Sequence, residues 1–87
     1  MFIKISKLPN LWRVKYLNDA KFIKAFGINL RRLRLQKNFS QEYLADEAGI
    51  PTNQVGRIER GEVNTSISTV NALAKALKID IADLFKL

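Results

Sequence analysis

The side chains best suited to chemistry in this sequence lie between residues 51 and 60. At roughly 100° per residue of a helix, Asn53 and Arg57 fall on the side opposite Val55 and Ile58. Arg can fork onto guanine O6 and N7, and Asn can pair with adenine N6 and N7. The pattern therefore predicts a helix with one buried edge and one exposed face that suits contacts with base edges.

Catalytic side chains are scarce. The chain contains no Cys and no His, which removes disulfides, thiolate nucleophiles, imidazole bases and two common metal ligands. The carboxylates from residue 42 onward include no pair that the pattern places in one cleft. We therefore expect no enzyme activity, no metal site and no cofactor.

Length and composition indicate one small, basic, folded domain. The chain has 87 residues, of which 47% are hydrophobic, and its net charge is +7. An excess of positive charge favours polyanionic partners, namely nucleic acid, an anionic membrane or an acidic protein. No apolar run is long enough for a membrane span or a signal peptide, so we expect a cytoplasmic protein without membrane attachment.

The hydrophobic pattern is helical from residue 19 onward. A first helix, about residues 19–37, carries six basic residues and one apolar stripe that predicts a core face, while Ile28 and Leu35 point the other way. The stripe consists of Phe22, Ile23, Phe26, Leu30 and Leu33.

Four further helices are expected after this one. Ser40 is a suitable N-cap and Gly49 a left-handed terminator for a second helix, about residues 40–48. The remaining helices are a third over about 51–60, a fourth over about 68–78, and a last turn capped by Asp80. The sequence thus predicts a compact, all-α, five-helix domain over residues 21–87.

Residues 1–20 form a basic N-terminal arm whose role the pattern leaves open. Trp12, Tyr16 and Leu17 can pack on Ile28 and Leu35, pair with a second subunit, or remain disordered. Packing on the same domain is the interpretation that we favour.

The segment SQEYLADEAGIPTNQVGRIERG, residues 40–61, has a characteristic spacing. Counted from Gln41 as the first position, Ala45, Gly49, Val55 and Ile58 occupy the fifth, ninth, fifteenth and eighteenth. This spacing resembles the helix-turn-helix of the phage repressor and Cro family, also called Xre-type transcriptional regulators. The resemblance covers about residues 21–87 and implies a repressor-like DNA-binding domain whose third helix is the recognition helix.

The resemblance also implies roles for individual residues. Base-contacting positions of the family fall on Thr52, Asn53 and Arg57, which would enter the major groove of double-stranded DNA. Positions that contact the DNA backbone fall on Gln41, Arg60, Asn64 and Thr65, and a structural salt bridge falls on Arg34 and Glu59. By the same resemblance the protein is expected to be nucleoid-associated and to bind as a homodimer on half-sites about 34 Å apart.

Two residues depart from the family pattern. Pro51 stands where a capping Ser or Thr is common and offers a phosphate neither an amide hydrogen nor a hydroxyl. Gly56 costs about 1 kcal/mol relative to Ala inside a helix. It either allows DNA to approach the backbone closely or reflects drift at an exposed position.

A second function is consistent with the same sequence. The apolar arm together with Ile28 and Leu35 also suits an antitoxin or docking module whose main partner is another protein.

The positive charge is unevenly distributed along the chain. Residues 41–62 carry five acids against only two basic residues, Arg57 and Arg60. The first helix and the arm, rather than the recognition unit, therefore supply the general attraction to phosphate.

Overall fold

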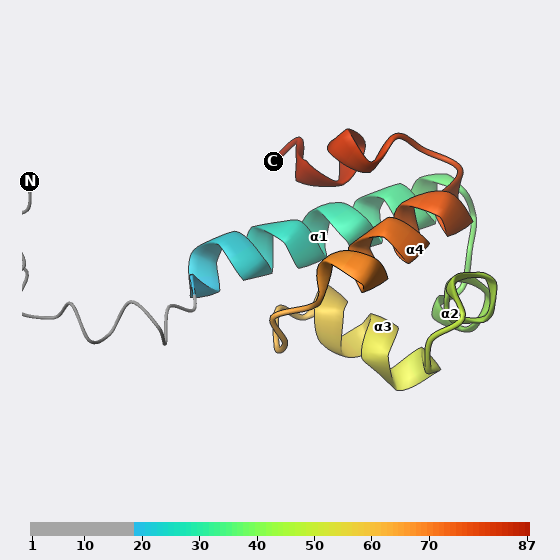
Figure 1. Ribbon diagram of the computed structural model, residues 1–87, viewed down its shortest axis with the longest axis horizontal. Coiled ribbons are helices and arrows are strands. Elements are labelled where there is room, and N and C mark those ends of the chain that lie inside the picture. Colours follow the sequence, from blue (N-terminus) through green and yellow to red (C-terminus); the bar gives the residue numbers. More distant parts are fainter. Residues whose placement is uncertain (1–18) are drawn as a thin grey trace, which may run out of the picture.

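The computed structural model describes residues 19–87, which contain helices and loops and no strand (Figure 1). The elements are α1 (Ala20–Gln36), α2 (Gln41–Ala48), α3 (Thr52–Glu59), α4 (Ile67–Leu77) and a 3-10 helix, η3 (Ile81–Phe85). The expected all-α fold is confirmed, but the fifth helix is a single 3-10 helix rather than an α-helix. The predictions about the arm fall almost wholly on residues 1–18 and lie outside the described residues.

Side-chain caps fix where the helices begin. Asp19 Oδ1 accepts a hydrogen bond from the backbone N–H of Phe22 at 3.0 Å, and Ser40 Oγ accepts one from Tyr43 N–H at 3.0 Å. Each cap satisfies an amide that has no partner within the helix. α4 begins earlier than the expected residue 68, because Ser66 caps it through Thr69 N–H at 3.1 Å.

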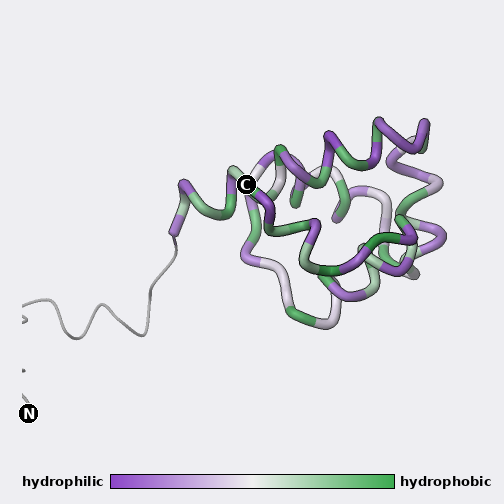
Figure 2. Tube along the Cα trace, turned by 90° about the horizontal axis from the view of Figure 1, so that it is seen from above, coloured by the Kyte–Doolittle hydropathy of each residue, from purple (hydrophilic) through white to green (hydrophobic). Residues whose placement is uncertain are grey.

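The core lies between α1, α2, α3 and α4, with η3 closing one side. The largest fully buried side chains come from all five elements: Leu30, Leu44, Val55, Ile58, Leu73, Leu77 and Leu84. Hydrophilic and hydrophobic stretches follow one another along the trace of α1, which is the pattern of an amphipathic helix (Figure 2). None of the helices in the described part is long and apolar enough to cross a membrane.

The expected core face of α1 is right for Phe26 and Leu30 and wrong for Phe22. Phe26 and Leu30 are buried and Leu33 packs on the core, whereas the Phe22 side chain is 47% exposed. Phe22 lies in the first turn of α1, and its ring stacks on Phe85 of η3 with centroids 6.4 Å apart. The helical period identified the face but not how far the rest of the fold extends along it.

A glycine sets how closely α1 and α3 approach each other. A Cβ atom at Gly27 would lie only 2.3 Å from the carbonyl oxygen of Ile58 and 2.6 Å from that of Glu59. Both neighbours are backbone atoms that cannot rotate away. The end of α3 therefore lies directly on the backbone of α1 at this position.

A buried asparagine fastens η3 to α1. Asn29 Nδ2 donates to the carbonyl oxygens of Asp83 at 3.0 Å and Leu84 at 2.9 Å. Its Oδ1 accepts from Arg32 Nη2 at 2.6 Å. Because Asn29 is buried and fully engaged, it positions the C-terminal turn and with it the buried Leu84.

Candidate nucleic-acid interface

α2 and α3 are joined by a tight turn that fixes the angle between them. Gly49 ends α2 in the left-handed conformation with φ of 75°, and Ile50 N–H donates to Ala45 O at 3.0 Å. Pro51 is the N-cap residue of α3, without a side-chain cap, so the expected helix start moves by one residue to Thr52. Only three residues separate the helices, which gives the geometry of a helix-turn-helix.

α3 buries one edge and exposes the opposite face. Val55 and Ile58 are fully buried against α1 and α2, while Thr52, Asn53 and Arg57 are exposed. The hydrophobic edge is therefore as the sequence predicted. The three residues assigned to base contacts lie on the surface, where such contacts are sterically possible.

A buried polar network holds the C-terminal end of α3. Arg34 and Glu59 form a bidentate ion pair, with Nε–Oε2 at 2.6 Å and Nη2–Oε1 at 3.0 Å, and their side chains are 7% and 2% exposed. Arg34 Nη1 also donates to the carbonyl oxygen of Phe39 at 2.8 Å. The hydrogen bond to Glu59 raises the pKa of Arg34 despite burial. The salt bridge that the resemblance implied is present, and it ties α3 to the end of α1.

Gln41 extends this network to the first turn of α2. Its Nε2 donates to Glu59 Oε1 at 3.0 Å, so one carboxylate receives donors from α1 and α2. The side chain is half-buried, and its amide faces α3. Gln41 is thus oriented by the fold, with part of its surface still accessible.

Gly56 is buried, so the expectation of an exposed position was wrong. A Cβ atom there would lie 3.0 Å from Arg60 Nη1 and 3.5 Å from Gln41 Oε1. These two side chains fold across the glycine and cover it. The helical wheel placed Gly56 correctly on the polar side but could not show which neighbours lie above it.

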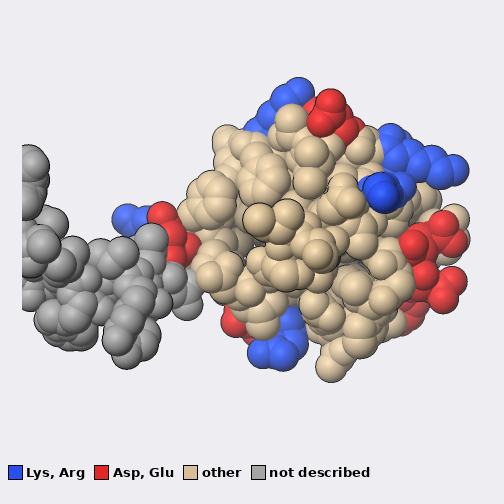
Figure 3. All heavy atoms as spheres, in the orientation of Figure 1, with Lys and Arg blue, Asp and Glu red and all other residues tan. Residues whose placement is uncertain are grey.

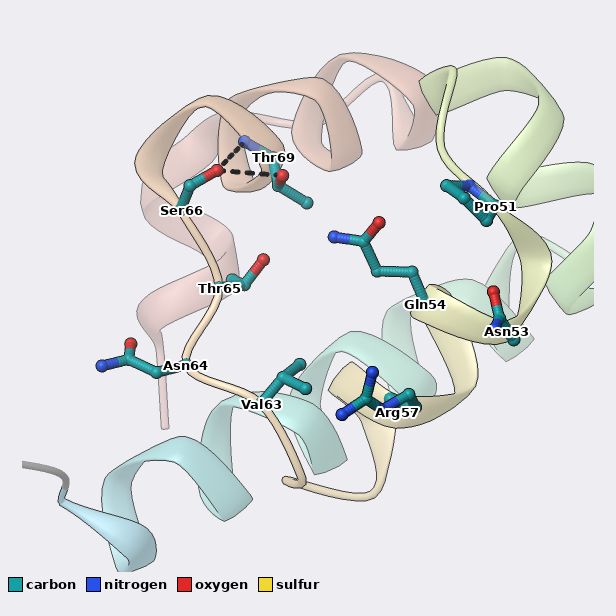
Figure 4. A pocket seen from close by; sticks show the side chains of 9 residues that line it. All are labelled: Pro51, Asn53, Gln54, Arg57, Val63, Asn64, Thr65, Ser66 and Thr69. Atoms are coloured by element: carbon teal, nitrogen blue, oxygen red, sulfur yellow. Dashed lines mark hydrogen bonds between the residues drawn. The ribbon is translucent and has the colours of Figure 1, made fainter.

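A pocket of about 320 Å³ opens between α3 and the segment that follows it (Figure 4). Its lining residues are Pro51, Asn53, Gln54, Arg57, Val63, Asn64, Thr65, Ser66 and Thr69. In Figure 4 the Gln54 side chain projects from α3 toward the segment between α3 and α4 that carries Thr65 and Ser66. The pocket has polar side chains on both sides and brings residues 64 and 65 to the same concave surface as Asn53 and Arg57.

The four expected backbone contacts differ in accessibility. Arg60 and Asn64 are exposed, and Gln41 and Thr65 are half-buried. Thr65 Oγ1 is buried and has no hydrogen-bond partner among the described residues. An unpaired buried hydroxyl is costly, and Thr65 lines the pocket, so an acceptor that enters the pocket is a favourable partner for this hydroxyl.

Glu62 is a residue at this surface that the sequence did not identify. Its carboxylate accepts from Arg60 Nε at 2.6 Å and lies 3.9 Å from Arg57 Nε. The hydrogen bond from Arg60 lowers the pKa of Glu62 and raises that of Arg60, so both stay ionised at neutral pH. The only signal in the sequence is an acid two residues after an arginine, which is too common to be diagnostic.

An apolar surface adjoins this polar pocket. Phe22, Ile67 and Phe85 are exposed, Ile67 to 85%, and they line a second pocket of about 200 Å³. Asn64 and Thr65 line both pockets. The centre of the face shown in Figure 3 is largely uncharged, and charged side chains lie mainly at its rim. Ile28 and Leu35 are exposed too, as the sequence predicted.

Comparison with known proteins gives consistent matches. The family model described as "Helix-turn-helix" matches residues 30–84. Control protein C.SmaI of Serratia marcescens is 41% identical over 56 residues, which cover 64% of this chain and 67% of that protein. Control protein C.BamHI of Bacillus amyloliquefaciens is 40% identical over 60 residues, covering 68% and 74% respectively.

A solved structure matches over much of the chain. The crystal structure of the restriction-modification controller protein C.AhdI from Aeromonas hydrophila superposes with a TM-score of 0.72 at 43% sequence identity. The match covers 77% of this chain and 100% of that structure.

Proposed function

This chain belongs to the helix-turn-helix family and is a DNA-binding transcriptional regulator, and we propose that α3 reads base sequence in the major groove. The base-reading residues in this proposal are Thr52, Asn53 and Arg57. The observation that carries it is the exposed Asn and Arg face of α3, which the buried Arg34–Glu59 pair holds at a fixed angle. Asn suits adenine and Arg suits guanine in the major groove.

The backbone contacts in this proposal flank the base-reading face. Arg60 and Asn64 are exposed beyond the end of α3, and Gln41 lies at the start of α2. Thr65 supplies its unpaired hydroxyl to an acceptor that enters the pocket. Such contacts fix the register of the protein on the duplex, whereas the face of α3 supplies sequence preference.

Selection of bound duplexes from a random library tests this function. We expect enrichment of a consensus with two-fold symmetry and half-sites about one helical turn apart. Recovery of unselected sequences at every round would contradict sequence-specific reading. Enrichment of a single unrepeated half-site would support base reading while contradicting dimeric binding.

The proposal includes binding of DNA by two subunits, and the apolar surface of Phe22, Ile67 and Phe85 supports this dimer. This surface adjoins the pocket beside α3 through residues 64 and 65, so a second copy bound there lies next to the DNA-facing side. Covering the exposed Ile67 side chain removes apolar area from water.

The likeness to controller proteins suggests which genes are regulated. C.AhdI is titled a restriction-modification controller protein, and C.SmaI and C.BamHI are control proteins. We propose that this chain likewise acts at the nucleoid, in the cytoplasm, on promoters of a restriction-modification system. Immunoprecipitation of the protein with its chromosomal sites is expected to recover such promoters, and recovery of unrelated promoters alone would contradict this assignment.

The alternative function is a module whose main partner is another protein, and the exposed Ile28 and Leu35 favour it. The two functions differ in what the purified protein does alone. A regulator binds its selected duplex without any partner, whereas a docking module requires one. Co-purification of a stoichiometric partner, together with no selective DNA binding by the isolated protein, would favour the alternative.

A further inference from the structure

Glu62 lies among the basic residues that face DNA in the proposed function, on which this inference rests. We propose that Glu62 sets the affinity of the protein for DNA by competing with phosphate for the guanidinium of Arg60. In the free protein its carboxylate occupies the Nε and Nη2 edge of Arg60, so a phosphate that approaches by this edge must displace it. Glu62 therefore weakens binding to every duplex by a similar factor and leaves base preference unchanged.

The turn after α3 fixes the position of the acid. Gly61, with φ of 72°, follows Arg60, the C-cap residue of α3. Gly61 N–H donates to Ile58 O at 3.0 Å, and Glu62 N–H donates to Arg57 O at 2.9 Å. These two bonds form a Schellman motif, which returns the chain over the last turn of the helix. A Cβ at Gly61 would lie 2.9 Å from Lys24 Cα, so this turn is also packed against α1.

The contact between Glu62 and Arg60 has the geometry needed to compete with phosphate. Arg60 Nε donates to Glu62 Oε2 at 2.6 Å and Arg60 Nη2 to Oε1 at 3.4 Å, a two-point contact of the kind that arginine also makes with phosphate. Arg57 is farther away, with 3.9 Å between its Nε and Glu62 Oε1. The competition consequently acts mainly through Arg60, which is the proposed phosphate contact, and not through a base-reading residue.

The Arg60–Glu62 ion pair is also weak enough for phosphate to displace the carboxylate. The side chains of Arg60 and Glu62 are 59% and 47% exposed, and exposed ion pairs contribute little to folding stability. Removing the carboxylate should therefore leave the fold intact. It should change binding, because affinity for the phosphate backbone depends directly on the number of cations available to it.

The test compares Glu62→Gln with Asp83→Asn by fluorescence anisotropy on the selected duplex and on a scrambled duplex. Asp83 of η3 pairs with Lys86 at 2.7 Å, so Asp83→Asn removes one negative charge and one partly exposed ion pair away from α3. We expect Glu62→Gln to bind both duplexes roughly 3- to 10-fold more tightly than wild type, and Asp83→Asn to stay within about twofold. The ratio between the two duplexes is expected to remain that of wild type.

Two further readouts distinguish competition from a structural effect. The slope of log affinity against log salt should steepen by up to about 0.9 per subunit in Glu62→Gln, because Arg60 no longer carries an internal counterion. In an Arg60→Gln background, Glu62→Gln should improve binding by less than about twofold, because the group for which it competes is gone.

The inference is overturned if Glu62→Gln binds like Asp83→Asn, binds more weakly than wild type, or keeps its gain in the Arg60→Gln background. Its failure is distinct from that of the proposed function. A wild-type protein that prefers the selected duplex, with no gain in Glu62→Gln, removes the role of Glu62 alone. A wild-type protein without preference for any duplex removes sequence-specific reading itself.

Discussion

Glu59 receives hydrogen bonds from Arg34 on α1 and from Gln41 on α2 while belonging to α3 itself. Three elements therefore meet at one buried carboxylate. The Arg34–Glu59 pair is costly to break on one side, because the remaining charge is buried and has lost its ionic partner. The orientation of α3 relative to α1 and α2 therefore depends on this residue.

Arg34→Met is predicted to lower the free energy of unfolding by about 3–5 kcal/mol, because it leaves Glu59 charged and buried without its main partner. The double variant Arg34→Met with Glu59→Met is predicted to recover much of this loss. Urea denaturation of both variants measures the difference. A cost below about 1 kcal/mol for the single variant, or a double variant that shows the summed cost of both, would contradict this account.

Between elements, the approach of α1 and α3 depends on the absence of a side chain at Gly27. The backbone carbonyls of Ile58 and Glu59 occupy the space that a Cβ would take. Gly56, which is also helical and buried, differs in that its neighbours are the movable ends of Arg60 and Gln41. Substituting each of the two glycines therefore compares a site that faces rigid backbone with a site that faces movable side chains.

Gly27→Ala is predicted to destabilise the fold by about 3 kcal/mol or more, since α1 and α3 must separate. Gly56→Ala is predicted to be neutral or to stabilise by up to about 1 kcal/mol, because Arg60 can move aside and Ala is the better helix former. Thermal unfolding of both variants tests the comparison. Equal melting temperatures in the two variants would be inconsistent with it.

Local signals in the sequence predicted most of the elements. Ser40 and Gly49 are capping residues whose preferences act over one turn of helix, and they begin and end α2 as expected. The period of Val55 and Ile58 likewise gave the buried edge of α3. These features depend on neighbours within a few residues of the chain, which is why they can be read without a structure.

What the sequence could not supply depends on contacts between distant segments. Phe22 stays 47% exposed although Phe85 of η3 stacks on its ring, and Gly56 is buried because two side chains fold over it. Asn29 anchors η3 across more than 50 residues. Glu62 acquires its position from the turn at Gly61, and its role follows from a distance rather than from its type.

Over the whole molecule, the net positive charge, the acidic residues and the exposed apolar surface lie in different regions. Residues 41–62 carry five acids and two arginines, and Glu62 engages Arg60 and lies near Arg57. The net charge of +7 therefore indicates the class of partner, while the recognition unit itself is net acidic. In the proposed function, the apolar surface of Phe22, Ile67 and Phe85 joins the two subunits.

Ile67→Glu is predicted to weaken self-association by at least tenfold while leaving the fold intact, because the side chain is 85% exposed and a carboxylate suits the first turn of α4. Sedimentation equilibrium of wild type and variant measures the association constant. Ile28→Glu, which alters an exposed apolar residue outside that pocket, is the control. Identical association of wild type and Ile67→Glu would place the interface elsewhere.

The central claim, that the exposed face of α3 reads bases, is tested most directly by binding Asn53→Ala and Arg57→Ala to the selected duplex and to single-base variants of it. Each substitution is predicted to cost about 1–3 kcal/mol on the selected duplex and to abolish discrimination at one base pair. Asn71→Ala, an exposed residue of α4 outside the pocket beside α3, should behave as wild type. If Asn53→Ala and Arg57→Ala bind every duplex as tightly and as selectively as wild type, the recognition face has been assigned wrongly.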